Sequence, residues 1–489
     1  MKSTKTSVEN SVELNTIVST PQGTAPEASV LSEKRKISTI ITSSAIDILA
    51  FFTAGLYYPA LIPLAQTLHV SKVNINLTIT SYMLAQGLTP LVTGNLSDQY
   101  GRRPVLLICL LISVGVNVGL ACQTNFAALA ALRCVQSFGS SGVISVTGGI
   151  IVDVITRSER GKYLAYTSIG ATIGTSLGPV LGGVLTQFLG WRSIFGFLAI
   201  LASILLIVVI VFQPETCRVV VGNGSVPPQP WNRPLLPPHR PGDPDVETRA
   251  TFSRRPKILD SVKLLLDKQM GQLILFISVV GWGSTAVIAS IPMLMEEKYY
   301  LNTLKIGLCY LPFAAGGITA RWTVGFLADW NFRRHSHQLG MKVERNRQSK
   351  AQLSRMPLEK VRLQIALPAI YYSSLFLLGY GWSLASNTHL SVPLIMLFFL
   401  GNGIAGVENT AGALIMDLQV YRAGMARAAV LLCRFIPGAG VIVAVPYLIQ
   451  SIGIGWLGTI IAGLWVASSL MLWVVYFKGH KWRGQSNKA

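Results

Sequence analysis

Apolar residues of this chain gather in long runs, and short polar segments separate one run from the next. A hydrocarbon core of about 30 Å requires about 20 apolar residues in a helix that crosses it. Twelve runs reach that length, so we predict an all-α membrane protein with twelve spanning helices. The predicted spans are 39–61, 76–97, 104–122, 126–154, 163–188, 192–212, 271–294, 304–330, 364–386, 391–418, 428–450 and 455–477.

Basic residues concentrate in alternate loops between these spans. The chain is 51% hydrophobic and only 13% charged, yet it carries a formal net charge of +20. If the N-terminus is cytoplasmic, 34 of the 41 Lys and Arg residues fall on the cytoplasmic side. This bias follows the positive-inside rule, so we predict that both termini are cytoplasmic. The charge is then expected to face the lipid bilayer and no nucleic acid.

A long basic segment divides the twelve spans into two sets of six. We predict two six-helix bundles, joined by a linker whose proline-rich part, Val226–Pro244, acts as an extended tether. The beginning of the chain has no apolar core, so we expect a disordered tail and no cleaved signal peptide. The predicted divisions are a cytoplasmic tail 1–38, an N-terminal bundle 39–212, a linker 213–270, a C-terminal bundle 271–477 and a cytoplasmic tail 478–489.

The stretch Gly94–Pro104, at the end of the second predicted span, combines an acid with two arginines. Asp98 lies at a helix C-terminus, where the helix dipole opposes its charge, and Arg102 can compensate that charge. The stretch resembles the signature between helices 2 and 3 of the major facilitator superfamily, and Gly325–Arg334 is a weaker echo of it in the second bundle. The resemblance implies a cytoplasmic gate. The residues assigned to gating are Gly94, Asp98, Gly101, Arg102, Arg103, Asp153, Asp329, Arg333 and Asp417.

Two further stretches narrow the resemblance. Leu132–Gly139 is similar to the arginine motif of helix 4, which implies that Arg133 takes part in proton coupling; a purely structural ion pair is the alternative. Gly174–Gly183 resembles the antiporter motif of helix 5, where closely spaced glycines admit a second helix and a proline kinks the span. The residues assigned to this motif are Gly174, Gly178, Pro179, Gly182 and Gly183.

Together these motifs resemble those of fungal 12-helix drug:proton antiporters, a group that includes quinidine-resistance-type pumps and citrate or organic-acid exporters. The resemblance implies a major facilitator fold that exports a small organic acid, secondary metabolite or xenobiotic in exchange for protons, by alternating access. A proton-coupled uptake symporter is the nearest alternative, and a non-transporting membrane sensor is a more distant one. We expect no enzymatic activity, no cofactor, no metal and a monomeric chain in the plasma membrane, with a vacuolar or other endomembrane as the alternative.

Ionisable residues inside the predicted spans are candidates for proton coupling, because a charge in lipid is costly unless it has a function. They are Asp47, Arg133, Arg321, Glu408 and Arg434. We predict that Glu408 carries the proton, since apolar surroundings favour the neutral form of a carboxyl group. The alternative for Glu408 is a fixed salt bridge to Arg434 or Arg321. For Asp47 we favour a structural or gating role over proton coupling.

Polar and aromatic side chains in several spans are candidates for a central substrate cavity of mixed polarity. They are Gln86, Gln136, Trp282, Tyr371, Tyr372, Asn402 and Asn409. Each of these side chains alone is also compatible with ordinary helix packing. Arg434 favours a carboxylate group in the cargo only weakly.

Overall fold

A computed structural model describes residues 31–71, 73–155, 160–222, 226–236, 263–338, 357–419 and 423–486. Throughout these ranges the chain forms helices, turns and loops, and no strand, in agreement with the predicted all-α fold. Most of the predicted tail 1–38 and residues 237–262 of the predicted linker lie outside the described ranges.

The long helices fall into two halves, one on either side of the linker. The first half contains α1 (Glu33–Gly55), α2 (Tyr57–Thr67), α3 (Leu77–Tyr100), α4 (Arg102–Cys122), α5 (Phe126–Val154), α6 (Arg160–Leu189), α7 (Arg192–Phe212) and the short α8 (Arg218–Val221). The second half contains α10 (Lys268–Tyr299), α11 (Thr303–Leu308), α12 (Leu311–Gln338), α14 (Leu358–Ala385), α15 (Ser391–Leu418), α16 (Ala423–Ile452) and α17 (Ile454–Ser486). Short 3-10 turns occur at Asn74–Asn76, Pro230–Asn232 and Leu264–Leu266.

Ten helical segments in the described part of the chain are long and apolar enough to cross a membrane. Two of the ten join neighbouring helices, α1 with α2 and α11 with α12. The helices α3 and α6 are also long, at 24 and 30 residues, but they are richer in Thr, Ser and Gly and fall outside the ten. The count of twelve spans therefore stays a prediction, whereas the multi-pass architecture is clear.

The helix boundaries follow the apolar runs closely except at two proline-dependent breaks. Spans predicted at 126–154, 192–212 and 391–418 coincide with α5, α7 and α15. The spans predicted as single helices at 39–61 and 304–330 are each divided, after Gly55 and after Leu308. In both cases a proline stands four residues later, Pro59 or Pro312, and has no N–H to donate to the carbonyl at the break.

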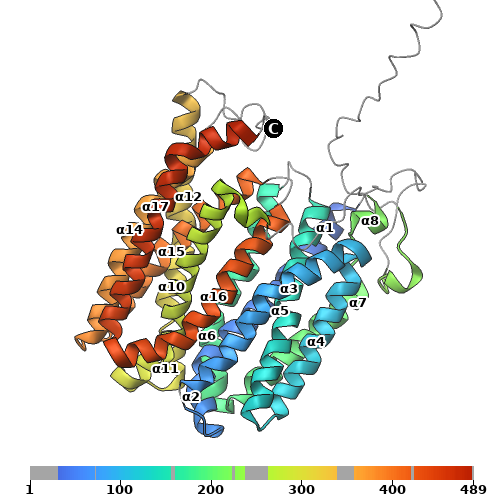
Figure 1. Cartoon of the computed structure of the whole chain (residues 1–489). Coiled ribbons are helices and arrows are strands. Elements are labelled where there is room, and N and C mark those ends of the chain that lie inside the picture. The colour runs from blue at the N-terminus through green and yellow to red at the C-terminus, as the bar shows by residue number, and fades with distance from the viewer. Residues whose placement is uncertain are drawn as a thin grey trace, which may run out of the picture.

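The two halves stand side by side, as Figure 1 shows. Within the first half α3 packs on α5 and α1 packs on α6; within the second, α14 packs on α15 and α17. The halves meet where α3 packs on α16 and where α6 packs on α11. The start of α1 and the end of α17 lie at the same end of the molecule, at the top of Figure 1, which we call the inner end. That this end faces the cytoplasm remains a prediction from the basic loops.

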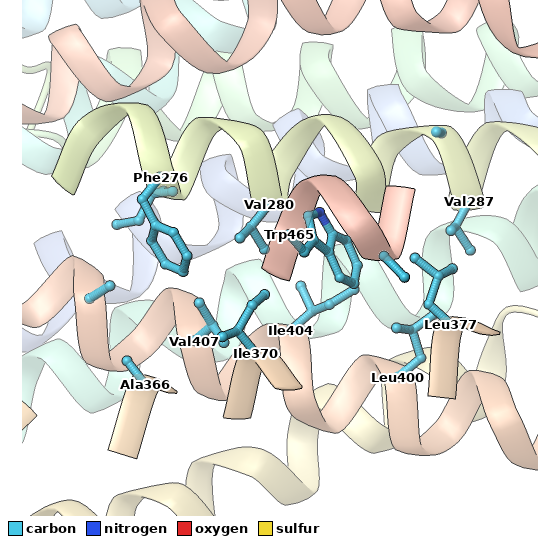
Figure 2. Packing of buried hydrophobic residues seen from close by; sticks show 14 of the residues in the cluster. Phe276, Val280, Val287, Ala366, Ile370, Leu377, Leu400, Ile404, Val407 and Trp465 are labelled. Carbon is cyan, nitrogen blue, oxygen red and sulfur yellow. The ribbon is translucent and has the colours of Figure 1, made fainter. Parts of the chain in front are cut away.

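The core of the second half is built around Trp465 of α17, which is fully buried. Its indole N–H donates to the carbonyl oxygen of Val279 in α10 at 3.3 Å. Figure 2 shows the ring among side chains of three other helices, including Val280 of α10, Ile370 of α14 and Ile404 of α15. A large ring with its polar atom satisfied fixes how these helices pack, so the second half has a well-defined core behind its cavity face.

The linker begins with a segment that lies against the first half, in contrast to the extended tether predicted there. The backbone N–H groups of Leu235 and Leu236 donate to the carbonyls of Ile210 and Val211 at 3.2 and 3.0 Å. In a continuing helix the Ile210 carbonyl would accept from residue 214, but Pro214 has no N–H. The docked segment therefore supplies hydrogen bonds that the end of α7 lacks. Composition alone gave no indication of this contact.

Candidate functional site

A cavity of about 120 Å³ lies between the two halves, close to the contact of α3 with α16. Its wall combines polar, aromatic and apolar side chains, and both halves contribute to it. The lining residues are Ala54, Tyr57, Tyr58, Ile79, Tyr82, Met83, Gln86, Arg133, Thr285 and Phe435. A space with a few convergent polar groups, set between two bundles, is the usual setting of a small-molecule site in a helical membrane protein.

Arg133 of α5 supplies positive charge to this cavity, although only 2% of its surface is exposed. Its guanidinium carbon lies 3.9 Å from the centre of the Tyr57 ring and 4.4 Å from that of Tyr82. Rings at these distances stabilise a cation through their π faces. One guanidinium nitrogen also donates to Gln136 Oε1 and to the carbonyl of Thr53. No carboxylate in the described ranges forms a salt bridge with Arg133, so its charge is held by aromatic rings and neutral acceptors.

A chain of side-chain hydrogen bonds fixes Gln136, and so the arginine that it contacts. The Gln136 amide donates to Asn117 Oδ1 at 2.7 Å, and the Asn117 amide donates to the Ser113 carbonyl at 2.6 Å. Gln136 therefore acts as an acceptor for Arg133 and does not line the cavity itself. Connected polar networks of this kind hold a buried cation in one orientation.

The two tyrosines that flank Arg133 are anchored by their hydroxyl groups. Tyr57 OH lies 2.6 Å from Thr78 Oγ1, and Tyr82 OH lies 2.8 Å from Ser140 Oγ. These rings and Tyr58 were not among the predicted site residues. Aromatic residues in an apolar span usually indicate packing, and only the contact with Arg133 distinguishes them. The pair Tyr57–Tyr58, so close to the helix-breaking Pro59, was the available signal.

Glu408 of α15 and Arg434 of α16 form an ion pair in the second half, with 2.8 Å between Oε1 and Nη1. Both side chains remain about one-quarter to one-third exposed. Gly281 of α10 leaves room for the arginine, because a Cβ atom there would lie 2.7 Å from Arg434 Nε. Arg434 and Arg133 both lie within electrostatic range of Tyr58 on the cavity wall. The ion pair is thus next to the cavity, and it matches the salt-bridge alternative for Glu408.

Asp47 and Arg321, the other two intramembrane charges, lie away from the cavity wall. Asp47 of α1 is buried and accepts a hydrogen bond from Thr147 Oγ1 of α5 at 2.7 Å. Arg427 of α16 is the cation within electrostatic range of Asp47, so this acid is adjacent to the other half. Arg321 of α12 is exposed. Only Arg133 of the five predicted intramembrane charges lines the cavity directly.

At the inner end of the first half, the residues of the Gly94–Pro104 stretch form a compact network. Gly101 separates α3 from α4 with φ of 110°, a conformation that other residues rarely adopt. Arg102 contacts Asp98 and pairs with Asp153 at the end of α5, with 2.9 Å between Nε and Oδ2. Three helices, α3, α4 and α5, are therefore tied by one arginine. We call this network the first latch.

Glu215, just beyond α7, completes the first latch, although it was not among the predicted gating residues. Its carboxylate accepts the backbone N–H groups of Arg102 and Arg103 at 2.9 and 3.1 Å, at the start of α4. It also accepts the side-chain amide of Asn232 at 2.9 Å. An acid at a helix N-terminus is favoured by the helix dipole and by the unpaired N–H groups there. Arg103 points elsewhere and donates to the Ile210 carbonyl.

The equivalent stretch of the second half is arranged differently. Helix α12 continues without a break through Asp329 and Arg333 to Gln338, and both of these side chains are exposed. Among the described residues neither belongs to a salt bridge. Instead Arg362, near the start of α14, pairs with Asp417 at the end of α15, with 3.1 Å between Nη2 and Oδ2. We call this ion pair the second latch.

The glycines of the predicted antiporter motif lie on two faces of α6. Gly174, Gly178 and Gly182 face α1 and the turn after it; a Cβ atom on Gly178 would lie 3.1 Å from the Cα of Gly55. On the other face, a Cβ atom on Gly183 would lie 2.9 Å from the Thr303 carbonyl oxygen, at the start of α11. The carbonyl oxygen of Pro179 approaches Gly307 of α11 in the same way. The motif therefore joins α6 both to its own half and to the other half.

Of the seven predicted cavity residues, only Gln86 lines the cavity. Trp282 donates to the Cys433 carbonyl, and Asn402 donates to Thr319 Oγ1 between α12 and α15. Tyr371 binds Ser469 between α14 and α17, and Tyr372 packs against Phe376. The polar atoms of Trp282, Tyr371 and Asn402 are therefore occupied by hydrogen bonds between helices of the second half. Asn409 is exposed, outside the cavity wall.

Spanning helices in two halves around a small cavity of mixed polarity are typical of a membrane transporter. The profile of the Major Facilitator Superfamily matches residues 45–443, and the chain belongs to this family. It is 40% identical over 461 residues to "MFS-type transporter R5" of a Phoma species, which covers 94% of this chain and 88% of that one. It is 30% identical over 472 residues to "Citrate exporter 1" of Aspergillus niger, covering 94% of this chain and 88% of that one.

A solved structure has the same fold. The crystal structure of the human organic anion transporter MFSD10 (TETRAN) matches 90% of this chain and 99% of its own, with a TM-score of 0.58. The two sequences are 19% identical, so this likeness concerns the fold alone. The predicted family and fold class are confirmed, and the chain is a multi-pass membrane transporter.

Proposed function

We propose that this chain is a proton-coupled efflux antiporter that exports a small organic acid by alternating access. The observation that carries the proposal is Arg133, a buried cation in the cavity wall with no carboxylate partner in the described ranges. A cargo carboxylate is the natural counter-ion for such a guanidinium, and charge-assisted hydrogen bonds are the strong ones. The rings of Tyr57 and Tyr82 and the amide of Gln86 add apolar and polar contacts. The similarity to a citrate exporter supports the same class of cargo.

Glu408 is the proposed proton carrier. Its carboxylate is partly exposed, lies in a spanning helix and pairs with Arg434 of the neighbouring helix. When Glu408 takes up a proton, this ion pair is lost, and with it a contact between α15 and α16. Because α16 packs on α3 of the other half, loosening that contact links proton uptake to movement between the halves.

The proposal is tested with the full-length protein in liposomes and radiolabelled citrate as the probe. An antiporter accumulates external citrate when the vesicle lumen is acidic, because protons leave as citrate enters. Passive diffusion of a weak acid and proton symport both give accumulation when the lumen is alkaline instead. Citrate uptake with an acidic lumen, above that of protein-free vesicles, is the expected result. Uptake only with an alkaline lumen, or none in either case, contradicts organic-acid antiport.

Two variants assign the roles. Arg133→Gln is expected to reduce citrate uptake at least about tenfold, the effect of losing one charge-assisted contact of about 1.5–3 kcal/mol. Glu408→Gln is expected to retain citrate exchange between equal pH values but to lose the response to a proton gradient. If Glu408→Gln responds to the gradient like the unsubstituted protein, Glu408 is not the carrier.

A further inference from the structure

The linker segment Val226–Leu236 is fixed to the inner end of the first half. Backbone hydrogen bonds from Leu235 and Leu236 join it to the last turn of α7. Asn232 is buried and donates to Glu215 Oε2 at 2.9 Å. Pro228 and Pro234 are buried as well. One side of this short segment is therefore a packed contact with the protein.

The opposite side of the segment exposes large apolar side chains. Trp231 is 64% exposed, Leu235 is 70% exposed and Leu236 is 52% exposed. Three such side chains within six residues are an unfavourable surface in water, at about 25 cal/mol for each Å² of apolar area. Arg233, also exposed, lies between them in the sequence.

This apolar side continues the outward surface of α7. Ile200, Ile204 and Ile207 are exposed at spacings of four and three residues, so they form one stripe along the helix. In a spanning helix such a stripe faces lipid. The next position on the stripe is Val211, the residue whose carbonyl accepts the N–H of Leu236. The linker segment thus sits where the lipid-facing stripe reaches the inner boundary of the membrane.

The chemistry of the segment fits the boundary between headgroups and acyl chains. Tryptophan is enriched at that depth because its ring is apolar and its N–H is polar. Leucine side chains reach into the acyl region, and an exposed arginine attracts lipid phosphate. We propose that Val226–Leu236 is a membrane-surface anchor, which places Trp231, Leu235 and Leu236 in the inner leaflet and ties that leaflet to the first latch through Asn232 and Glu215.

The anchor is tested by quenching of Trp231 fluorescence. Full-length protein and its Trp231→Phe variant are placed in vesicles of phosphatidylcholine with phosphatidylglycerol, and the difference between their spectra gives the Trp231 signal. Lipids brominated in the upper acyl chain are expected to quench this signal about twofold or more, since interfacial side chains lie about 5–10 Å into the boundary. The same measurement on Trp322→Phe gives, for comparison, the signal of a tryptophan outside the linker that is 72% exposed on α12.

Quenching by aqueous acrylamide with none from brominated lipid means that Trp231 faces water, and this overturns the anchor. A signal that neither agent quenches means that a second copy or another protein covers it, and this overturns the anchor too. If Trp231→Phe does not fold, the Leu235→Trp variant, which keeps Trp231, gives an independent signal. The difference between its spectrum and that of the unsubstituted protein is the signal of the added tryptophan. Brominated lipid is expected to quench the added signal about twofold as well.

Discussion

The two inner ends of the molecule use the same pair of positions in unequal ways. In each half, an acid at the end of one helix, Asp153 of α5 or Asp417 of α15, pairs with an arginine near the start of another, Arg102 of α4 or Arg362 of α14. In the first latch the side chains are only 13% and 10% exposed, whereas in the second they are 24% and 36% exposed. The first latch also includes Glu215, Gly101 and Asp98.

This difference indicates that the first half is the more rigid at its inner end. A buried, multiply bonded ion pair resists separation, since removing one partner leaves a charge without compensation. An exposed pair contributes little, because water and salt replace it readily. We therefore expect the second half to yield first when the inner end rearranges. Four substitutions test the comparison.

Arg102→Gln is expected to have the largest effect. It removes the cation that holds Asp98 and Asp153, and loss of one partner from a buried pair costs about 3–5 kcal/mol of unfolding free energy. Denaturation of the purified protein measures this loss. A change below about 1 kcal/mol, the range of exposed pairs, would mean that the first latch is no stronger than the second.

Cys217 reports the state of the first latch chemically. Its thiol is buried and lies 3.6 Å from the Asp98 carbonyl oxygen, and burial raises its pKa to about 11. Alkylation requires the thiolate, so it is expected to be slow at neutral pH and to accelerate only as the pH approaches 11. Arg102 itself lowers the pKa of the Cys217 thiol, but burial is the larger influence on it. If Arg102→Gln opens the latch to water, the loss of burial is therefore expected to lower the pKa and to accelerate alkylation at neutral pH. Mass spectrometry of the Cys217 peptide gives the rate, and equal rates in the two proteins would contradict the coupling.

Gly101→Ala is expected to come second. Its φ of 110° is a region almost confined to glycine, and an added Cβ would also meet the Glu215 carboxylate, with 3.1 Å to Cδ. The expected loss is about 1–3 kcal/mol of unfolding free energy. Gly325→Ala is the matched control, because a Cβ there meets nothing within 4 Å and the helix continues. Equal losses in the two variants would show that the first turn has no special strain.

Arg362→Gln, the counterpart of Arg102→Gln, is expected to cost only about 0–1 kcal/mol because its pair with Asp417 is partly exposed. Added salt should reduce even this difference, since screening weakens exposed pairs. Denaturation at low and high salt measures both. A loss as large as that of Arg102→Gln would remove the asymmetry between the latches.

Asp329→Asn is expected to have the smallest effect on the unfolding free energy, within about 0.5 kcal/mol. Substitution of an exposed side chain that takes part in no buried contact or ion pair rarely changes this free energy by more. The comparison with Asp98→Asn at the equivalent position of the first half is the useful one. Asp98 contacts Arg102, whereas Asp329 is exposed on a continuous helix. If both substitutions destabilise the protein equally, Asp329 has a stabilising contact comparable to that of Asp98 with Arg102, and the asymmetry is contradicted.

The helices and the family could be predicted from the sequence, because spans such as α5, α7 and α15 end where charged or helix-breaking residues meet apolar runs. The breaks after Gly55 and Leu308 were missed, although Pro59 and Pro312 were visible, since proline only kinks many spanning helices. The docked linker was missed for a different reason. Its hydrogen bonds compensate a missing N–H at Pro214, and such pairing depends on tertiary contacts.

The site was predicted in outline only. Arg133 and Gln86 were identified because polar groups in apolar spans are conspicuous, and both line the cavity. Tyr57 and Tyr82 were not, because their role comes from their distance to the guanidinium. Glu215 was likewise not predicted, because its contact with the start of α4 depends on the fold.

Binding of citrate to the purified full-length protein tests the proposal that the cavity binds an organic acid most directly. Titration calorimetry of the unsubstituted protein and Arg133→Gln compares their affinities, with Arg321→Gln, an exposed arginine of α12, as the control. Arg133→Gln is expected to bind at least about tenfold more weakly, corresponding to about 1.4 kcal/mol, and Arg321→Gln is expected to bind with unchanged affinity. Equal affinity of Arg133→Gln and the unsubstituted protein would contradict Arg133 as the anion-binding residue of the cavity.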